Sequence, residues 1–535
     1  MIEIPQMGRE DLWQTGFTEE DLAATEGGRT LIDEFKQDYS LFGDCLKITA
    51  HDLEAAIEQF ESSLGRKPNE EERNIIAALR SGLISITKRW TEMGEQGDLF
   101  DSISETPEGQ NVSLKQEEMN RLEAELREWF NLVAGFKNVF SKVTHDFESI
   151  YELGDSIKRP DSEKTQWYSR GFDESIQRYE TTFAAEFGLA DVVVLNSGMS
   201  AIEACFSALE LREGDVVLVG QEFYLQTPKI FADYAKRGAK IITVDTNNLE
   251  GLEQAISENK PRAVFLESIE NDTPMGTADL GKLITINSQW NSTHPEQPCR
   301  LILDNTFASL GLMDLQEKVR ASGLADVQWA VTESATKYYQ QGMDNITAGL
   351  VYSDDPEFMQ GVRDRRKLIG THLQAKLGSY LPAPDVELLE HRMMRHSMNA
   401  LYLASALERA GLKVSYPGLQ SHPHHQEANS GFEVGVGGVF YIACDNADGN
   451  PQQFLNMVRA EARELGVGFK LGVSFGHPET WAETIPPSLG EDWHANDTRQ
   501  WEVRVMAGGE NVAEIKKIAE SFERALKKTE TSRKI

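Results

Sequence analysis

The chain has 535 residues, enough for two to four domains at about 100–200 residues each, and its 40% hydrophobic and 26% charged residues are ordinary for a soluble globular protein. Its net charge of −33 excludes a global electrostatic surface for nucleic acid or anionic lipid, because such surfaces depend on Lys and Arg. The longest apolar runs, such as 192–195, fall far short of the about 20 residues that a membrane span needs.

The four cysteines are widely separated, with no CxxC pair among Cys45, Cys205, Cys299 and Cys444. This spacing disfavours a disulfide framework or a cysteine-rich zinc module. The first ten residues also lack a basic segment followed by an apolar one, so we expect no secretory signal. Together these features predict a cytoplasmic protein.

The first 150 residues form an acidic region of helical pattern. They contain 15 Lys and Arg against 31 Asp and Glu, a net charge of −16. Apolar residues recur at helical spacing over 53–64, 75–90 and 119–133, with a polar, glycine-containing loop expected over 94–112. We interpret these stripes as the core faces of a helical bundle, because no catalytic pattern accompanies them.

After about residue 165, short strands alternate with helices. This alternation predicts βαβ units and a mostly parallel sheet, and the nearly continuous apolar strands predict helices on both of its faces. A smaller α+β domain is expected to follow, with a helix over 385–411, strand-like segments over 431–444 and a last helix over 511–527. The predicted strands of the sheet are 192–196, 216–220, 240–245, 263–268, 300–305, 329–334 and 348–353.

Three strand ends carry candidate chemical groups, and ligands of open parallel sheets bind at the carboxyl ends of strands. Gly198 lies between a strand and a helix, where backbone N–H groups bind anions. Asp304 lies at the end of a later predicted strand, and Lys337 lies just past another. Taken singly, these residues are equally typical of a βα turn, a helix cap and an exposed loop lysine. Together they match what pyridoxal phosphate requires: a phosphate cradle, a carboxylate for the pyridinium nitrogen and a lysine for the Schiff base.

The amino-acid sequence of these segments resembles that of the Cys/Met-metabolism pyridoxal-phosphate enzymes, which include cystathionine γ-synthase, cystathionine γ-lyase and methionine γ-lyase. The resemblance extends from about residue 165 to 530. The D-N-T-F and S-A-T-K-Y motifs occur intact at 304–307 and 334–338. Similar segments are Tyr168-Ser169-Arg170, Ser197 to Ala201, Tyr224 to Thr227, Glu267 to Asp272, Tyr416 to Leu419, Ser421 to Pro423, Val473 to Gly476 and Val503 to Glu510.

The resemblance implies a role for each matching residue. Lys337, Tyr224 and Asp304 would be catalytic, and Ser474 and Arg504 would bind the substrate carboxylate, for which the planar arginine fork is suited. Tyr224 would also stack on the cofactor ring, and Asn271 would contact its hydroxyl. The implied cofactor-binding residues are Tyr168, Arg170, Gly198, Met199, Tyr224, Asn271, Asp304, Ser334, Thr336 and Lys337.

The resemblance also implies a fold-type I enzyme of three parts: an acidic helical extension over 1–150, an arm and large cofactor-binding domain over 151–370, and a small C-terminal domain over 371–535. Tyr168 and Arg170 would reach the phosphate of a neighbouring subunit, so a homodimer or homotetramer is expected. The implied partner is a small amino acid, with no nucleic acid and no membrane. The cluster of His422, His424 and His425 is not interpreted as a metal site, since no carboxylate partners are evident.

The implied reaction is γ-elimination or γ-replacement on a γ-substituted L-amino acid, as in trans-sulfuration. Differences from the family at Leu225, Gln226 and Pro274 fall where relatives form the substrate pocket, so the substrate stays open. A γ-halogenated, unsaturated amino acid that yields a terminal alkyne is one specialised option, and β-elimination is the alternative reaction. A non-catalytic protein with a partner-binding N-terminal module is the alternative from another class, disfavoured by intact Lys337, Asp304 and Arg504.

Overall fold

The computed structural model describes residues 67–95, 174–340, 346–378, 381–432, 435–443, 451–485 and 502–533, with single residues between 46 and 61 and between 122 and 129. The chain divides into two compact units. One consists of Met1–Thr18, Glu180–His372 and Pro384–Ile535, and the other of Glu19–Tyr179 and Leu373–Ala383. The three-part division predicted from the sequence stays a prediction.

The unit of residues 19–179 and 373–383 contains helix α3 (Glu70–Glu95) and the short helix α14 (Ala375–Gly378). Asn69 and Glu72 bond to each other's backbone N–H groups, a reciprocal cap at the start of α3. The predicted stripe over 75–90 is confirmed here, because Ile76, Leu79, Leu83 and Ile86 are all buried.

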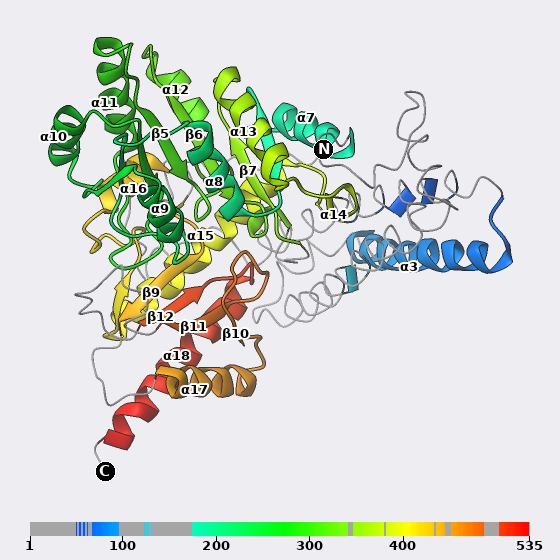
Figure 1. Cartoon of the computed structure of the whole chain (residues 1–535). Helices are drawn as coiled ribbons and strands as arrows, with labels where there is room; N and C mark the ends of the chain where they lie inside the picture. Colours follow the sequence, from blue (N-terminus) through cyan, green and yellow to red (C-terminus); the bar gives the residue numbers. More distant parts are fainter. Residues whose placement is uncertain are drawn as a thin grey trace. The chain divides into compact units, whose positions relative to one another are not determined.

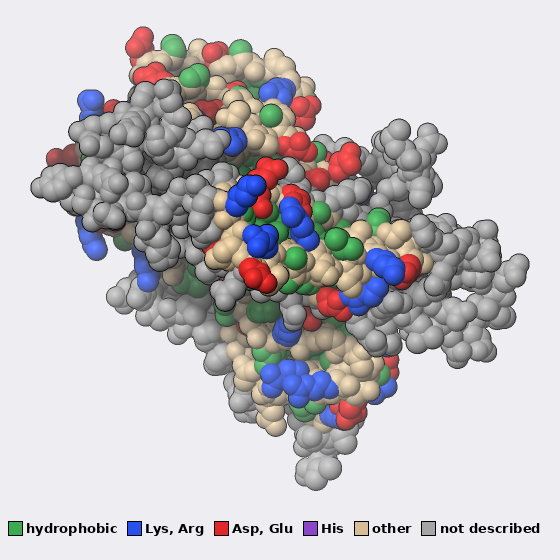
Figure 2. All heavy atoms as spheres, turned by 90° about the vertical axis from the view of Figure 1, so that its right-hand side faces the viewer, with side chains coloured by type: hydrophobic (Ala, Val, Ile, Leu, Met, Phe, Trp, Pro, Cys, Tyr) green, Lys and Arg blue, Asp and Glu red, His purple; other side chains and the backbone are tan. Residues whose placement is uncertain are grey.

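Gly82 provides a close approach on α3. A Cβ atom at this position would lie 1.7 Å from the Trp129 ring, so the ring packs there only against a glycine. Leu122 and Leu126, from the same predicted stripe as Trp129, are buried as well. Figure 2 shows the side of the molecule that lies to the right in Figure 1. Among the described residues on that side, acidic and basic side chains are interspersed.

A seven-stranded sheet organises the first part of the other unit, in the order β1-β7-β6-β5-β4-β2-β3. β7 is antiparallel to both of its neighbours, and the remaining pairs are parallel. This arrangement confirms the predicted mostly parallel sheet. The strands are β1 (Val192–Leu195), β2 (Val216–Val219), β3 (Lys240–Thr243), β4 (Ala263–Glu267), β5 (Arg300–Asp304), β6 (Trp329–Ser334) and β7 (Gly349–Tyr352).

Both faces of this sheet are covered, because every residue of β4 and β5 is buried. Residues Phe265, Ile302 and Ala330 join a core with helices α8, α9 and α13, which are drawn around the sheet in Figure 1. The helices of this part are α7 (Glu174–Glu186), α8 (Gly198–Ala208), α9 (Thr227–Lys236), α10 (Leu249–Asn259), α11 (Leu280–Thr293), α12 (Leu315–Ser322), the 3-10 turn η2 (Tyr338–Gln340) and α13 (Pro356–Ile369).

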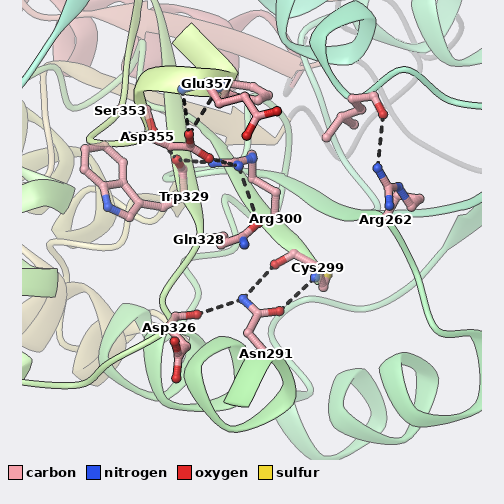
Figure 3. Close-up of polar contacts among 12 residues, drawn as sticks. Arg262, Asn291, Cys299, Arg300, Asp326, Gln328, Trp329, Ser353, Asp355 and Glu357 are labelled. Carbon is pink, nitrogen blue, oxygen red and sulfur yellow. Dashed lines mark hydrogen bonds and ion pairs between the residues drawn. The ribbon is translucent and has the colours of Figure 1, made fainter. Parts of the chain in front are cut away.

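Arg300 connects the amino end of β5 to the start of α13 (Figure 3). Its guanidinium bonds to the Trp329 carbonyl at 3.1 Å, lies over the Phe358 ring at 4.1 Å and pairs with Asp355 at 2.5 Å. Asp355 in turn accepts the N–H groups of Glu357 and Phe358 and so caps α13. This network fixes the sheet edge opposite the predicted site.

A five-stranded sheet, ordered β10-β11-β12-β9-β8, forms the last part. All its pairs are antiparallel except β10 with β11. The α+β pattern predicted for this part is confirmed, with α17 and α18 drawn in orange and red in Figure 1. Its elements are α15 (Val386–Arg409), β8 (Lys413–Ser415), α16 (His425–Gly431), β9 (Val439–Ala443), α17 (Pro451–Glu464), β10 (Lys470–Leu471), β11 (Trp481–Ile485), β12 (Glu502–Met506) and α18 (Val512–Arg533).

The strand-like pattern over 431–444 was predicted too long. Within its described residues only Val439–Ala443 forms a strand. The chain before it has positive φ at Gly435 (144°) and Gly437 (80°), which a regular strand does not allow. A Cβ at Gly437 would also lie 2.6 Å from the Phe307 carbonyl oxygen, so this glycine permits a close approach to the D-N-T-F segment.

A search of the described residues finds no helix both long and apolar enough to cross a membrane.

Candidate active site

The predicted site residues Asp304, Ser334 and Lys337 lie at one edge of the seven-stranded sheet. Strands β4, β5 and β6 are parallel neighbours, so their carboxyl ends meet there. Glu267 at the end of β4 is paired in register with Asp304 at the end of β5. The sequence predicts functional groups at the carboxyl ends of parallel strands, and the fold places these residues at neighbouring strand ends.

Gly198 begins helix α8 directly after β1, as predicted for a phosphate cradle. Ser197 caps the helix by accepting the Ser200 N–H, and Ser200 reciprocates toward the Ser197 N–H. A Cβ at Gly198 would lie 3.1 Å from the Ser334 Cβ, tighter than a normal contact. The start of α8 is thus packed closely against the end of β6, and a helix start of this kind could bind a phosphate through its N–H groups.

Asp304 is a buried carboxylate whose Oδ1 atom is held in place. The hydroxyl and N–H of Thr306 donate to it at 2.6 and 3.0 Å, and the Ser334 N–H donates to the same hydroxyl at 3.0 Å. Burial raises the pKa of Asp304 to about 6, against the two hydrogen bonds from Thr306. A cationic partner would offset the cost of burying the charged carboxylate, so Asp304 fits the predicted pairing with a pyridinium nitrogen.

Lys337 follows β6, and its side chain reaches the last part of the chain. Its Nζ atom donates to Ser474 Oγ at 2.6 Å and lies 5.5 Å from the centroid of the Phe475 ring. Thr336, one residue earlier, is fixed by the Ala348 N–H at 3.1 Å. The structure thus brings together Lys337 and Ser474, which are 137 residues apart.

Arg504 and Asn271 also lie together. Arg504 Nη1 donates to Asn271 Oδ1 at 3.2 Å, and the Tyr441 hydroxyl donates to the same oxygen at 3.0 Å. Arg504 Nη2 donates to the Val473 carbonyl at 2.8 Å and forms an ion pair with Glu483. The predicted carboxylate-binding arginine therefore faces a carboxylate of the chain itself.

Glu267 fixes two segments predicted to contact the cofactor ring. Its Oε1 accepts the Tyr224 N–H at 2.7 Å, and its Oε2 accepts the Asn271 N–H at 2.9 Å. Burial, followed by the neighbouring Asp304, raises the pKa of Glu267 well above its usual range. Tyr224 as a whole residue is 38% exposed, so it is not enclosed by the protein.

Glu333 lies buried beneath the same edge. Asn305, Tyr339 and Tyr352 donate to its carboxylate at 2.9, 2.6 and 2.6 Å. Burial raises the pKa of Glu333 to about 7, although these three donors oppose the shift. Since Asn305 follows Asp304 and Tyr339 comes two residues after Lys337, the network holds both strand ends in register.

Four residues of the site were not identified from the sequence: Glu267, Thr306, Glu333 and Glu483. Thr306 belongs to the intact D-N-T-F motif and could have been found there. Glu267 likewise begins the family-like segment Glu267 to Asp272 and could have been found there. Glu333 and Glu483 carry no local signal, because what distinguishes them is burial beside partners distant in the chain. Met199 is partly buried against the core, and Tyr168 and Arg170 lie outside the described residues.

The histidine cluster is held by carbonyl groups. His422 Nε2 contacts the Pro274 carbonyl at 2.5 Å, and His425 Nδ1 contacts the Pro417 carbonyl at 3.0 Å. Among the described residues, no group of three His, Cys, Asp or Glu side chains has an arrangement that could hold a metal ion.

Comparisons with solved structures agree with this fold. Cystathionine gamma synthase from Xanthomonas oryzae pv. oryzae, in complex with aminoacrylate and cysteine, aligns with a TM-score of 0.56 at 23% identity, over 69% of this chain and 90% of that one. Cystathionine gamma-lyase from Lactobacillus plantarum, complexed with L-serine, aligns with a TM-score of 0.56 at 22% identity, over 68% and 91%. These likenesses establish the fold-type I architecture expected from the sequence.

Comparisons of sequence establish the family. Methionine gamma-lyase of Arabidopsis thaliana is 27% identical over 58% of this chain and 67% of its own length. O-succinylhomoserine sulfhydrylase of Pseudomonas aeruginosa is 30% identical over 58% and 73%, and cystathionine beta-lyase of Lactococcus lactis subsp. cremoris is 27% identical over 61% and 80%. The family model described as Cys/Met metabolism PLP-dependent enzyme matches residues 136–527. The chain therefore belongs to the Cys/Met-metabolism family of pyridoxal-phosphate-dependent enzymes.

Proposed function

We propose that this enzyme catalyses γ-elimination or γ-replacement on a γ-substituted L-amino acid. The observation that supports this most is the contact of Lys337 Nζ with Ser474 Oγ at 2.6 Å. Ser474 follows Val473, whose carbonyl accepts a hydrogen bond from Arg504. An amine able to move protons is thus linked, through the adjacent residues Ser474 and Val473, to an arginine able to bind an α-carboxylate, and an α-amino acid substrate requires both groups.

The residues present fit pyridoxal phosphate, and we assign them as follows. The start of α8 at Gly198 and Met199, with Ser334 and Thr336, would hold the phosphate. Asp304 would pair with the ring nitrogen, Asn271 would contact the ring hydroxyl and Tyr224 would stack on the ring. Bound in this way, the cofactor supplies an electron sink for negative charge that develops on the substrate.

Within that frame, the chain's own groups move the protons. Lys337 Nζ takes the proton from the substrate Cα and, once it has passed that proton on, takes a second proton from Cβ. The bond from Cγ to its substituent then breaks, and the hydroxyl of Tyr224 or Lys337 Nζ protonates the leaving group. Arg504 and Ser474 hold the substrate carboxylate throughout, which keeps Cα within reach of the lysine.

A β-elimination on a carbon–sulfur bond is the second candidate. It is favoured by the similarity to the cystathionine beta-lyase of Lactococcus lactis, which is close to the similarity to the methionine gamma-lyase. Both reactions need the same lysine and carboxylate site, and they differ in which bond breaks. The residues around Tyr224 that depart from the family, Leu225 and Gln226, are placed to influence that choice.

The products distinguish these reactions. The purified holoenzyme would be incubated with L-methionine, L-cystathionine, O-succinyl-L-homoserine with and without a thiol, S-methyl-L-cysteine and a γ-halogenated allylic amino acid, and the products identified by mass. We expect 2-oxobutanoate or a γ-exchanged amino acid from a γ-substituted compound, or a terminal alkyne from the halogenated one. Pyruvate formed only from β-substituted compounds would instead support β-elimination. Lys337→Ala is the inactive control.

We further propose that the active unit is a homodimer or homotetramer, in which Tyr168 and Arg170 complete the neighbouring chain's phosphate site. The acidic helical region over 1–150 would pack on its own protein rather than catalyse a second reaction. Deletion of residues 1–150 should then leave cofactor binding intact but change the oligomeric state or the substrate KM. Unchanged assembly and kinetics would contradict this role.

A further inference from the structure

Glu483 lies in the part of the site that we assign to the substrate carboxylate. It is on β11, paired in register with Arg504 on the antiparallel strand β12, so the two side chains emerge on the same face. Both side chains are largely buried, with exposed fractions of 14% for Glu483 and 12% for Arg504. Lys337 also acts electrostatically on Glu483. One internal carboxylate therefore lies near both cationic groups of the site.

The donors of Arg504 are divided among its neighbours. Nη1 donates to Asn271 Oδ1, and Nη2 donates to the Val473 carbonyl while facing Glu483. Nε is buried and has no hydrogen-bond partner within the described part of the chain. The edge formed by Nε and Nη2 is the one on which a ligand carboxylate could be bound with two hydrogen bonds.

Of these two atoms, Nη2 is the one that already pairs with Glu483. A ligand carboxylate that bonds to Nη2 would therefore share this atom with the Glu483 carboxylate, and two like charges in a largely buried site repel each other. Burial already raises the pKa of Glu483, although Arg504 and Lys337 oppose the shift. Of these two cations, Arg504 stabilises the Glu483 carboxylate more. A ligand that takes Nη2 must therefore replace Glu483 in this ion pair.

We propose that Glu483 is a resident competitor for Arg504. It neutralises the guanidinium when no amino acid is bound, and it must leave Nη2 when a substrate carboxylate binds. The inference rests on the proposed role of Arg504 and adds to it a residue that sets substrate affinity. A ligand then binds well only if its other groups contribute enough to displace Glu483, which selects against small amino acids that share only the α-carboxylate.

Calorimetric titration of the holoenzyme tests this proposal. The probes are L-alanine, which has no leaving group, and propionate, which has a carboxylate and no amine. Glu483→Gln should lower the Kd of both by about threefold to tenfold, the range expected for loss of a competing ion pair. Glu479→Gln is the matched control, because Glu479 lies just before the same strand and pairs with Lys470 instead. Its Kd values should stay within about twofold of wild type.

An unchanged or raised Kd in a folded Glu483→Gln variant would overturn the proposal. If that variant does not fold, Glu483→Asp keeps the charge but shortens its reach, and it should also lower both Kd values. Arg504→Gln distinguishes a failure of the carboxylate site from a failure of the competitor role of Glu483. If Arg504→Gln leaves the Kd of both probes unchanged, the carboxylate site itself is wrong. If it weakens binding while Glu483→Gln changes nothing, only the competitor role fails.

Discussion

The Nζ atom of Lys337 donates a hydrogen bond to Ser474 Oγ, and this 2.6 Å contact joins the loop after β6 to the segment after β10. The two residues were selected from separate segments of the sequence and serve different predicted roles. Their contact means that one site is built from both sheets. It also means that the position of Lys337 depends on how the last part of the chain packs.

Asp304→Asn should impair Cα deprotonation more than cofactor retention. The amide cannot carry the charge that would stabilise a protonated ring nitrogen, whereas the residues proposed to hold the phosphate, such as Gly198 and Ser334, are untouched. We expect exchange of the substrate α-proton, followed by NMR in deuterated water, to slow by at least about 100-fold. Cofactor content measured by absorbance should fall much less. Exchange at a near wild-type rate would contradict the role of Asp304.

Mixing two inactive variants should restore activity. An Arg170→Ala chain and a Lys337→Ala chain can form a mixed dimer in which one site has the intact lysine and the neighbour's intact arginine. After subunit exchange at equal amounts, about a quarter of all sites would be complete. Activity should therefore return to about that fraction of wild type. No recovery, after exchange has been verified by mass, would indicate that each site is built from one chain.

Asp355 should contribute to the stability of the unit that carries the active site. Asp355→Ala removes both the cap of α13 and the ion pair with Arg300 at 2.5 Å. We expect a loss of about 2 kcal/mol in urea unfolding, and about half of that for Asp355→Asn, which keeps an acceptor for the cap.

The exposed pair of Asp233 and Arg237 provides the control for that measurement. Both side chains are more than half exposed, at 53% and 55%, so Asp233→Ala should change stability by less than about 1 kcal/mol. Equal effects of Asp233→Ala and Asp355→Ala would show that the buried network around Arg300 contributes no more to stability than an exposed ion pair.

His422 should make the protein less stable in acid. Its Nδ1 accepts the His424 N–H and its Nε2 faces the Pro274 carbonyl, so the neutral ring fits this site. Burial lowers the pKa of His422 to about 4 from an ordinary value of 6.5. Because the folded state binds the proton less well than the unfolded state, this contribution is complete above pH 6.5 and is lost as the pH falls to about 4.

The stability difference between wild type and His422→Gln should therefore be larger at pH 7 than at pH 4.5, measured as the urea midpoint. Ser322→Ala is the control, because the Ser322 hydroxyl donates to the Val319 carbonyl at 2.7 Å and does not titrate in this range. Its effect should not depend on pH. A pH-independent difference for His422→Gln would contradict the assignment.

Much of the fold followed from local pattern. The seven strands of the large sheet were found within one or two residues, because buried parallel strands are continuous apolar runs. The segment before Val439 was misread, since its glycines mark positive φ and a close approach to Phe307 rather than a strand.

The site residues, too, were only partly predictable from the sequence. Gly198, Asp304 and Lys337 could be found because each lies at the carboxyl end of a strand or within three residues after it. Ser474, Asn271 and Arg504 came from family resemblance alone, since nothing local distinguishes them. Glu333 and Glu483 could not be found at all: a glutamate in a strand is usually exposed, and only the fold reveals that these two are buried beside Asn305 and Arg504.

The decisive measurement is the site at which the cofactor is attached. The yellow holoenzyme would be reduced with borohydride, digested and mapped by mass spectrometry, with Lys337→Ala treated in parallel. We expect one peptide carrying the reduced cofactor, with the modification on Lys337, and no such peptide from the variant. Modification of a different lysine, or full visible absorbance retained by Lys337→Ala, would contradict the assignment of Lys337.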